Sequence, residues 1–391
     1  MKTMNWKFGI MALAAGMSLF TACSDDDDDD DDDDDRVGSV VVDDGTVLKG
    51  HITSDVTLKA GSTYKLSGEY IIEEGAVLNI EEGVRIVAVY DDIVDYILVK
   101  QGGKINAVGT ADAPIVMTSE KETPGAWGGI HLCGRAHTNA EGGKGSSEIG
   151  GAQYGGTVEN DNSGVLKYVR VEYTGYAFDE EHEANGITFY GVGNGTLVEN
   201  CQAYKGSDDG FEFFGGSVNV SNLVAVSCSD DSFDWTEGWN GHGINLLAYQ
   251  ESEASLGYDC DCLIEADNNE NNYSATPVSH PVLTNLTLVG NGGKKQGIRL
   301  RRGTEVEIDG AVICGKDNPL SVESVETENA LKTGQSILEN VRISSTLSSK
   351  ENIYTNDDFT ASGNIVDNSI QYDSFNAAKA ACSWITGSWV R

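Results

Sequence analysis

The chain has 391 residues, of which 62 are Asp or Glu and 26 are Lys or Arg, so its formal net charge is −36. This charge argues against nucleic acids and anionic polysaccharides as simple electrostatic partners, because both are polyanions. Divalent cations and neutral or cationic ligands fit the charge better, and we expect a monomer that binds no nucleic acid.

The first 22 residues have the pattern of a secretory signal. Two lysines precede an apolar stretch at residues 8–20, and small residues follow. The stretch is too short to cross a bilayer of about 30 Å as a helix. Thr21-Ala22-Cys23 resembles a bacterial lipobox, which implies cleavage after residue 22 and acylation of Cys23. An ordinary signal followed by an unrelated Cys is the alternative.

Residues 25–35 are an unbroken run of eleven Asp. Such a run repels itself and buries nothing, so residues 23–36 are expected to form a disordered tether after the lipidated Cys23. An acidic run in this place resembles the surface-export signal of Bacteroidota lipoproteins, which implies a lipid anchor in the outer membrane and a position on the cell surface. Calcium binding by the run is the alternative. Without residues 1–22 the net charge is −38, and without the Asp run as well it is −27, so the remaining chain is acidic by itself.

From residue 37 onward, short segments of alternating apolar residues are separated by Gly, Asn and Asp, which is typical of strands. Six segments align in one register, at residues 129–133, 186–190, 210–214, 232–236, 263–267 and 297–301. The second and fourth residues of each are apolar and are expected to point inward, whereas the third and fifth are polar or mixed and point outward. Two consecutive intervals are 24 and 22 residues. We therefore expect residues 37–391 to form an all-β domain, a single-stranded right-handed parallel β-helix with about 22 residues per coil.

A second register repeats between these segments. The pattern apolar-x-Asn-apolar occurs at residues 198–201, 220–223, 283–286 and 338–341, and Gly310 replaces the Asn in 308–311. Asn and Gly tolerate a left-handed backbone, so this position is expected to be a tight corner between two sheets. Stacked Asn side chains can hydrogen-bond along the helix as a ladder. Tyr168 breaks the pattern, and we expect an irregular coil there.

Several segments carry a family resemblance. Residues 78–83 (Leu-Asn-Ile-Glu-Glu-Gly) and 103–110 (Gly-Lys-Ile-Asn-Ala-Val-Gly-Thr) resemble the opening coils of pectin-lyase-like β-helix proteins. Residues 208–216, 234–239 and 264–268 resemble a family of uncharacterised Bacteroidota lipoproteins with that fold. The resemblance covers roughly residues 45–391. It implies the fold and assigns no reaction.

The aligned repeats place acidic side chains on one face. The first outward column reads His131, Thr188, Glu212, Asp234, Glu265 and Arg299, and the second reads Cys133, Tyr190, Phe214, Thr236, Asp267 and Arg301. Three adjacent coils thereby carry Asp208, Asp209, Glu212, Asp230, Asp231, Asp234, Asp261, Glu265 and Asp267, and the next coil carries Arg299, Arg301 and Arg302. Carboxylates stacked about 4.8 Å apart are unfavourable unless Ca²⁺, arginines or shared protons neutralise them.

Three interpretations of this face stay open. Ca²⁺ is bound by about six to eight oxygens, and the candidate metal ligands are Asp208, Asp209, Asp230, Asp231, Asp234, Glu265 and Asp267. The candidate catalytic residues are Asp208, Asp209, Glu212, Asp234 and Arg299. They would serve as acid and base in glycoside hydrolysis, or in a site that resembles the calcium-and-arginine sites of polysaccharide lyases on this fold. The third interpretation is that solvated acidic residues only decorate the surface and shape the turns.

Three short elements resemble those of polygalacturonases in part: Asp208-Asp209, Gly241-His242-Gly243 and Arg299-Leu300-Arg301. The intervals between them are 33 and 58 residues, longer than the coil spacing of that family. Arg301 stands where that family has Lys. Only Asn185-Gly186 remains of its Asn-Thr-Asp element, which puts the general acid in doubt. His242 is otherwise a histidine in a Gly-rich loop.

Two further features could form a binding cleft. Residues 136–164 are a Gly- and Ser-rich insertion of a length that is usually functional or disordered. Aromatic rings at expected outward or loop positions suit stacking on sugar rings: Trp127, Tyr190, Phe214, Trp239 and Tyr258. With His242 and Arg301, the first four are our candidate ligand-binding residues. Packing of the insertion back onto the coil is the alternative, and Phe213 and Trp235 are expected in the core.

The remaining features concern the ends of the fold and the cysteines. Residues 375–384 have helical propensity and are expected to cover the end of the β-helix as a small C-terminal cap. Apart from Cys23 there are seven Cys at irregular spacings without a CxxC pair, so we infer no disulfide framework or zinc site. Cys260 and Cys262, which flank Asp261, are a weak hint of a metal site.

The features together favour a surface lipoprotein that binds a polysaccharide or another extracellular glycan with bound Ca²⁺. A polysaccharide lyase or glycoside hydrolase that uses the acidic face is one alternative, and a structural or adhesive surface protein is another. An enzyme should show two suitably spaced carboxylates, or a metal-bound cluster beside a free Arg, inside a cleft. A binder should show a metal in the cluster and aromatic rings on a flat groove.

Overall fold

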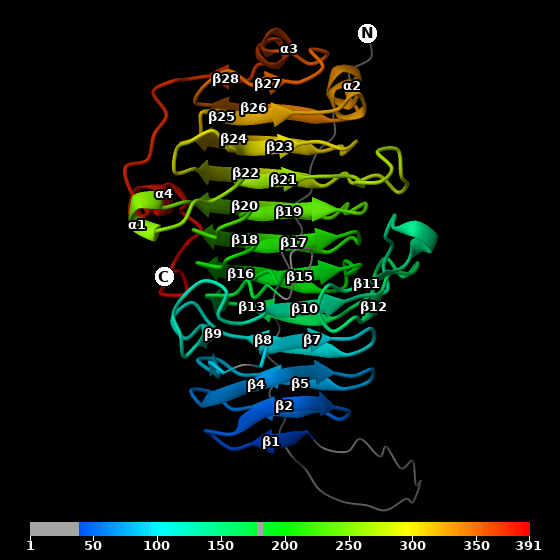
Figure 1. Ribbon diagram of the computed structural model, residues 1–391, viewed down its shortest axis with the longest axis vertical. Coiled ribbons are helices and arrows are strands. Elements are labelled where there is room, and N and C mark those ends of the chain that lie inside the picture. Colours follow the sequence, from blue (N-terminus) through cyan, green and yellow to red (C-terminus); the bar gives the residue numbers. More distant parts are fainter. Residues whose placement is uncertain (1–38, 92, 178–182) are drawn as a thin grey trace, which may run out of the picture. The chain divides into compact units, whose positions relative to one another are not determined.

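The computed structural model describes residues 39–391 apart from residues 92 and 178–182. This part of the chain winds into the expected right-handed parallel β-helix, in which 26 of the described strands form one continuous ladder (Figure 1). The expected signal at residues 1–22, the lipidation site Cys23 and the tether lie outside the described residues. Within them, no helix is long and apolar enough to cross a bilayer.

Three parallel sheets form the faces of the β-helix. Sheet 1 contains β1 (Val40–Val42), β3 (Val56–Leu58), β5 (Val77–Ile80), β8 (Lys104–Val108) and β13 (Gly164–Lys167). It continues in the first halves of β16 (Leu197–Tyr204), β18 (Asn219–Val226), β20 (His242–Tyr249), β22 (Val282–Val289), β24 (Glu307–Cys314) and β26 (Ile337–Ile343). The second halves of these six strands turn the corner into sheet 2.

Sheet 2 begins with the first halves of β2 (Val47–Ile52) and β4 (Thr63–Ile72), followed by β6 (Arg85–Ala88), β9 (Ile115–Ser119) and β14 (Val169–Glu172), and it ends with β28 (Ile365–Val366). Sheet 3 takes the second halves of β2 and β4. Its other strands are β7 (Tyr96–Val99), β10 (Ile130–Cys133), β15 (Ile187–Tyr190), β17 (Phe211–Phe214), β19 (Phe233–Thr236), β21 (Ile264–Ala266), β23 (Gln296–Leu300), β25 (Asn318–Val322) and β27 (Ser348–Ser349).

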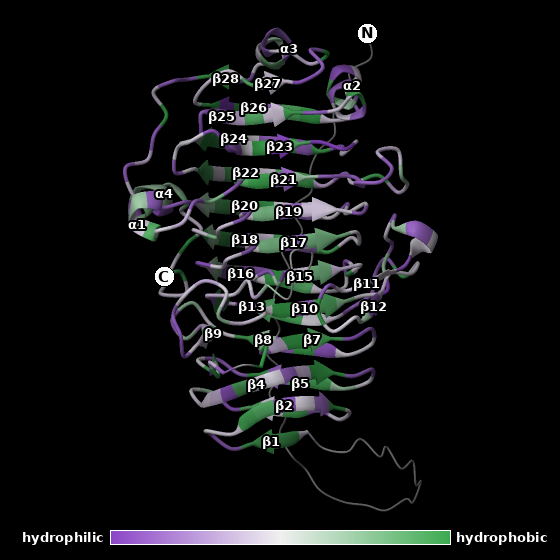
Figure 2. Ribbon diagram, in the orientation of Figure 1, coloured by the Kyte–Doolittle hydropathy of each residue, from purple (hydrophilic) through white to green (hydrophobic). Residues whose placement is uncertain are grey.

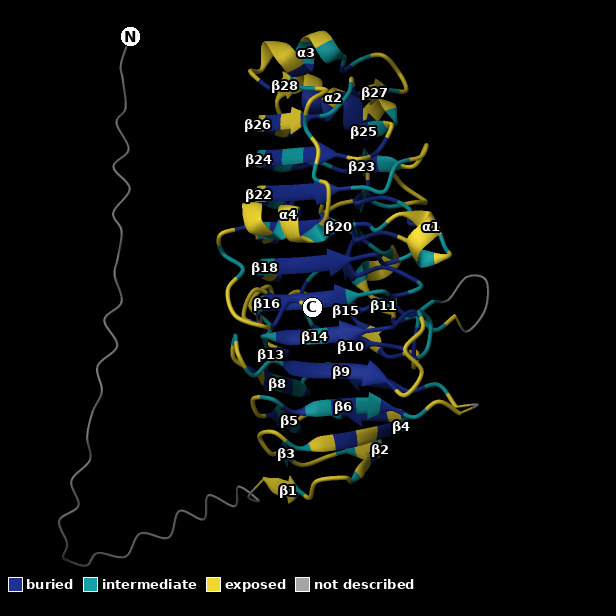
Figure 3. Cartoon of the chain, turned by 90° about the vertical axis from the view of Figure 1, so that its left-hand side faces the viewer, coloured by how far each residue is buried: buried dark blue, intermediate teal, exposed yellow. Residues whose placement is uncertain are grey.

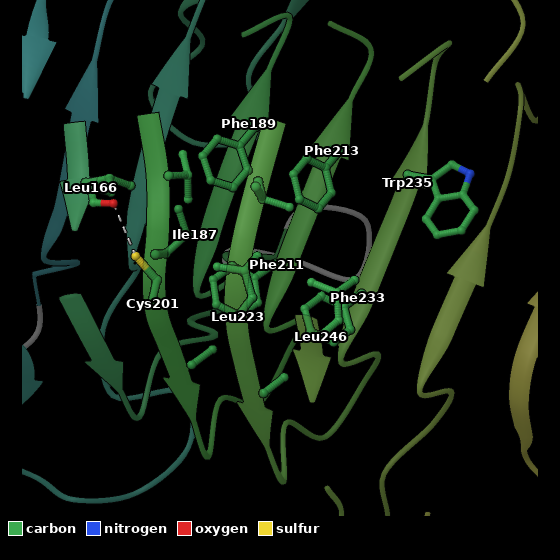
Figure 4. Close-up of a cluster of buried hydrophobic side chains, with 14 of the residues drawn as sticks. Leu166, Ile187, Phe189, Cys201, Phe211, Phe213, Leu223, Phe233, Trp235 and Leu246 are labelled. Atoms are coloured by element: carbon green, nitrogen blue, oxygen red, sulfur yellow. Dashed lines mark hydrogen bonds between the residues drawn. The ribbon is translucent and has the colours of Figure 1, made fainter. Parts of the chain in front are cut away.

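The aligned segments of the sequence form neighbouring strands of sheet 3. Phe211 of β17 pairs with Phe233 of β19, which confirms the 22-residue coil. The inward residues fill the interior, where Phe189 stacks on Phe213 at 5.0 Å and Phe211 on Phe233 at 5.5 Å between ring centroids (Figure 4). Phe213 and Trp235 are buried, as expected. Because the same column recurs in each coil, apolar burial accumulates along the whole stack.

The Asn corner joins sheets 1 and 2. Asn200, Asn222 and Asn285 have left-handed φ values of 57°, 57° and 61°. The Asn222 amide donates to Asn200 Oδ1 at 3.0 Å, which confirms a ladder. Asn245 belongs to the ladder too, donating to Asn222 at 2.7 Å, although Gly243 hides the pattern in the sequence. Tyr168 takes a left-handed φ of 53° at the same corner, but the strand is interrupted there between β13 and β14, whereas β16 runs through the corner unbroken, so the coil is irregular at Tyr168 as expected.

The insertion at residues 136–164 packs against sheet 3. It contains a short 3₁₀ turn, Glu141–Gly143, and an antiparallel pair, β11 (Gly145–Ser146) and β12 (Gln153–Tyr154). A second apolar cluster joins it to the sheet: Leu98, Cys133, Ile149, Ala152, Tyr154 and Tyr190 are among its members. Figure 2 shows hydrophobic residues along the strands and a hydrophilic tip on the insertion.

Four helices complete the described chain: α1 (Glu253–Leu256), α2 (Val325–Thr333), α3 (Asn356–Ala361) and α4 (Phe375–Ala381). The small C-terminal helical cap is present, but α3 provides it, with Phe359 buried in the main core. The helix expected there, α4, lies on the flank of the stack instead (Figure 3). It covers an apolar patch of sheet 2 together with Trp389 and Val390, because Val224, Leu247 and similar outward residues there are apolar.

Candidate functional site

The acidic face, also called the acidic strip, lies on sheet 3 over β17, β19 and β21. It consists of Asp208, Asp209, Glu212, Asp230, Asp231, Asp234, Asp261, Glu265 and Asp267. Glu212 pairs with Asp234, Asp234 with Glu265, and Glu265 with Arg299 on successive strands. This is the outward column expected from the sequence. The Asp pairs that precede the strands lie beside it, since Asp231 N donates to Asp209 Oδ1 at 2.8 Å.

Three groups of side chains approach closely enough to share a cation. One oxygen from each of Asp209, Glu212 and Asp234 lies within 4.8 Å of the others. Asp209 also belongs to a group with Asp208 and Asp230. The third group combines Asp231, Cys262 and Glu265. Cys262 is thus the cysteine of the Asp-Cys-Asp-Cys segment that contacts the acidic strip, while Cys260 is in none of the three groups.

The arginines neutralise only one end of this strip. Arg299 Nη1 lies 3.0 Å from Glu265 Oε2, and Arg301 Nε lies 2.8 Å from Asp267 Oδ1. Arg299 Nε is also 2.9 Å from Glu323 Oε1, and Arg302 Nη1 is 2.9 Å from Asp267 Oδ2. All three arginines are therefore held in ion pairs, and none of them is unpaired and available to act on a substrate.

At the other end, the carboxylates have no such partners. Among the described residues, no Lys or Arg forms an ion pair with Asp209, Glu212 or Asp234. Asp209 and Glu212 are 5% and 9% exposed. Burial raises the pKa of Asp209 well above its usual range, and Asp208 and Asp231 raise it further. This end of the strip thus needs a cation or protons from solution.

The same burial governs the neighbouring groups. Burial raises the pKa of Glu212, as do the charges of Glu148 and Asp234, while the hydrogen bond from Asn185 lowers it. Burial also raises the pKa of Asp234, with Glu265 and Asp267 adding to the shift and Arg301 opposing it. In the described structure, Asp234 Oδ1 is sealed from solvent and has no hydrogen-bond partner. An orphaned carboxylate oxygen beside two further carboxylates fits a hard divalent cation such as Ca²⁺.

A cleft of about 330 Å³ opens over these residues. Its floor includes Glu212, Phe214 and Asp234. One wall is Glu148 of the insertion, and the other is formed by residues 269–271, which follow β21. Figure 1 shows both excursions on the same side of the stack.

The two walls are joined by a buried pair of amides. Asn139 Nδ2 donates to Asn268 Oδ1 at 2.8 Å and to Pro277 O at 2.9 Å, and Asn269 Nδ2 donates to Asn139 Oδ1 at 2.9 Å. The insertion therefore has a fixed position beside the acidic strip, and the cleft exists before a ligand binds.

Three of the proposed sugar-binding aromatics are not at the surface. Tyr190 is fully buried under the insertion, with its hydroxyl donating to Glu148 Oε2 at 3.0 Å. Trp127 is 1% exposed and donates to Glu172 O. Trp239 stacks on Phe213 inside the coil, with 4.1 Å between ring centroids. The prediction for these three was wrong because the insertion and the coil corner cover them; Phe214 is half-buried and lines the cleft.

A neighbouring cavity of about 390 Å³ shares Arg301 and Arg302 with the cleft and is also lined by Tyr273 and Lys350. Tyr273 is 39% exposed and was missed by the sequence reasoning, because it belongs to a loop without periodicity.

The three elements that resemble those of polygalacturonases do not lie together in one site. His242 is exposed at the start of β20 on sheet 1, where it pairs with Val282. The acidic column belongs to sheet 3, so His242 is not part of it. Arg299 lies on β23, two strands beyond Asp234, and is occupied by Glu265 and Glu323. These facts correct the placement of His242 with the cleft and the role of Arg299 as a free catalytic group.

Comparison with known proteins adds the family. No protein among the curated sequences matches the chain. Residues 50–391 match the model of a family described as the pectate-lyase like beta helix domain. Membership points to a carbohydrate-related function without distinguishing binding from catalysis. Since the match spans most of the 391 residues, the chain belongs to the family of pectate-lyase like beta helix domains.

Proposed function

We propose that this protein binds Ca²⁺ through Asp209, Glu212 and Asp234 and uses the cleft above that ion to bind an extracellular glycan. The observation that carries the proposal is the close approach of the buried Asp209 and Glu212 carboxylates and the half-buried Asp234, whose Oδ1 is sealed from solvent, without an ion-pair partner in the described structure. A carboxylate deprived of water and of a counter-charge is destabilised, and a bound divalent cation removes the cost for all three.

The choice of Ca²⁺ follows from the donor atoms. The three ligands are all oxygen donors, which Ca²⁺ prefers, whereas zinc favours Cys and His. Asp208 and Asp230, which approach Asp209, can supply further oxygens. The group that contains Cys262 is less suited, because its Glu265 is already bound by Arg299.

The lining of the cleft suits a sugar. Thr236 and Asn271 offer a hydroxyl and an amide group that can bond to sugar hydroxyls. Phe214 lies in the cleft, and the exposed Tyr273 lines the adjoining cavity, so each can offer an aromatic face. The carbohydrate-related family supports a glycan as the ligand class.

Calorimetric titration of the chelated protein with Ca²⁺ tests the metal. We expect binding and a rise in melting temperature, both reversed by EDTA, since a ligand of the native state stabilises it. Asp234→Asn should weaken the binding at least tenfold because it removes the charge of the orphaned carboxylate. Glu339→Gln is the matched control: Glu339 is an exposed outward carboxylate on β26 of sheet 1. Absence of Ca²⁺ binding in the unmodified protein would refute the proposal.

A glycan array probed with and without Ca²⁺ tests the ligand. Bound glycans are then incubated with the protein, and new reducing ends and unsaturated sugar products are measured. Binding without product supports a binding protein. Product formation would instead support the second candidate, a carbohydrate-active enzyme.

One observation favours a hydrolase within that second candidate. Glu212 and Asp234 offer oxygens within 4.8 Å of each other, and both have a raised pKa, which suits a general acid at neutral pH. Oxygens this close argue against the wide separation, roughly 6.5–9.5 Å between carboxyl groups, of inverting glycosidases. A lyase is less favoured because the three arginines are ion-paired.

We further propose that Cys23 carries the lipid anchor and that the protein is a Bacteroidota-type surface lipoprotein of the outer membrane. Support comes from the signal pattern at residues 1–22 and the Asp run after Cys23. Metabolic labelling with an alkyne fatty acid should mark the protein and not its Cys23→Ser variant. Protease treatment of intact cells should digest it if it lies on the surface; protection would contradict that location.

A further inference from the structure

Asn185 lies at the edge of the cation site, just before β15, and has no role in the function proposed above. It is 1% exposed, and its neighbour Gly186 is tightly placed, with Gly186 N donating to Asp209 O at 2.8 Å. A Cβ at Gly186 would lie 2.4 Å from Gly210 O, so only glycine allows this approach of the two coils. The backbone next to Asn185 is therefore fixed by the hydrogen bond between these two coils, and this fixes where the Asn185 side chain begins.

The Asn185 amide contacts two of the three proposed cation ligands. Its Nδ2 donates a short hydrogen bond to Glu212 Oε2. Its Oδ1 accepts from Asp209 N at 3.2 Å. A weaker contact of 3.3 Å joins Nδ2 to Thr188 Oγ1, which holds the amide plane in place.

We propose that Asn185 is a positioning residue of the cation site, an inference that rests on the proposed Ca²⁺ binding. By holding Glu212 Oε2, it leaves Oε1 as the oxygen available to a cation. By accepting a hydrogen bond from Asp209 N, it also orients Asp209. Asp209 belongs both to the group with Glu212 and Asp234 and to the group with Asp208 and Asp230. Among the described side chains, Asn185 is the one that donates to the Glu212 carboxylate.

The test compares Asn185→Ala with a matched control in a Ca²⁺ titration. Residues that orient metal ligands change metal affinity by roughly 10- to 100-fold when they are removed, and we expect a loss in that range. Asn364→Ala is the control. Asn364 is 4% exposed and makes two comparable bonds, from Val341 N at 2.9 Å and to Leu338 O at 2.8 Å, but lies on the terminal coil. The Ca²⁺ affinity of the Asn364→Ala variant should stay within about twofold of that of the unmodified protein.

A charge exchange separates positioning from general damage to the fold. Asn185→Asp and Glu212→Gln should each weaken binding, the first by placing two acceptors face to face. The double variant restores a donor and an acceptor with the polarity reversed and keeps the net charge of the pair. We expect the double variant to bind Ca²⁺ at least tenfold more tightly than Asn185→Asp alone.

The outcomes are distinct. If the unmodified protein binds no Ca²⁺, both the proposed function and this inference fail. If it binds Ca²⁺ and Asn185→Ala binds equally well, or the exchange brings no recovery, only the role of Asn185 is refuted. Luminescence decay of bound Tb³⁺ gives a second readout, because a displaced Glu212 admits additional water to the ion and shortens the decay.

Discussion

Burial, more than the number of acidic residues, distinguishes the site from the rest of this acidic chain. Glu339 on sheet 1 is an exposed outward carboxylate, whereas Glu212, at an equivalent outward position on sheet 3, is 9% exposed. The difference comes from the insertion at residues 136–164 and the loop after β21, which line the cleft over Glu212 with Glu148 and residues 269–271. Water cannot screen the covered carboxylates, so their mutual repulsion stays strong.

This burial predicts a pH dependence of stability. Asp209, Glu212 and Asp234 have raised pKa values in the folded protein, so the folded state holds protons more tightly than the unfolded state. Their stabilising contribution is complete below the unfolded pKa near 4 and is lost as the pH rises through the folded pKa. In EDTA, the melting temperature should therefore fall as the pH rises above the usual range of carboxyl pKa values, and Ca²⁺ should remove most of that fall.

Two buried groups away from the acidic face also affect this measurement. Burial lowers the pKa of His131 to about 4 from 6.5, so it opposes the trend only below pH 6.5. Burial raises the pKa of Asp95 to about 7 and acts in the same direction as the cluster. Glu212→Gln leaves Asp95 unchanged, so a shallower pH dependence in this variant isolates the cluster. An unchanged dependence would contradict the assignment.

At the scale of elements, the insertion behaves as part of the β-helix. Tyr154 of β12 is 4% exposed and its ring lies 5.1 Å from that of Tyr190 on β15. The Tyr154 hydroxyl donates to Glu237 Oε2 at 2.8 Å, and Thr138 donates to the same oxygen at 2.6 Å. Apolar packing and charge-assisted bonds thus hold one wall of the cleft against sheet 3.

Tyr154→Ala should release that wall. Loss of a buried aromatic side chain costs about 3–5 kcal/mol, and residues 136–164 should become sensitive to limited proteolysis at low protease concentration. Tyr154→Phe keeps the ring and loses only the bond to Glu237, at a cost of about 1.5–3 kcal/mol. Urea unfolding measures both. Equal protease resistance of Tyr154→Ala and the unmodified protein would show that the ring does not hold the insertion.

Across the whole molecule, residues 375–391 connect coils far apart in sequence. Glu172 on β14 is 1% exposed, and its oxygens are held by Arg170 Nε at 2.8 Å and Arg391 Nη1 at 3.0 Å. Arg391 N donates to Gln202 Oε1 at 2.8 Å, and the guanidinium lies over the Tyr204 ring at 4.8 Å. This flank segment covers the apolar patch of sheet 2 that would otherwise face water (Figure 3).

Arg391→Ala should therefore destabilise the protein by about 1.5–3 kcal/mol, the usual value of a hydrogen bond to a charged group. Glu172 keeps Arg170, so a larger loss is not expected. Arg342→Ala is the control, since its bond to Asp367 at 2.7 Å joins more exposed side chains; surface pairs contribute about 0–1 kcal/mol. Chemical denaturation compares the two. Equal losses would show that the Glu172 pair has no special weight.

The repeat register, the inward aromatic column and the Asn corner follow from the sequence alone. Apolar alternation with a constant interval allows one stacking of the coils, and only Asn or Gly fits most of the left-handed corners. The order of the outward acidic column followed for the same reason: residues at equal repeat positions must be neighbours on adjacent strands.

Exposure, in contrast, was decided by the tertiary structure. The sequence shows that Tyr190 and Glu212 point out of the coil, but the excursion that covers them comes from residues distant in the chain and has no periodic pattern. The same holds for α4, whose helical propensity does not specify which apolar patch it covers. Long-range packing also commits the arginines to Glu265, Asp267 and Glu323. It is this packing that leaves Asp209, Glu212 and Asp234 as the part of the acidic face without an arginine or lysine partner among the described residues.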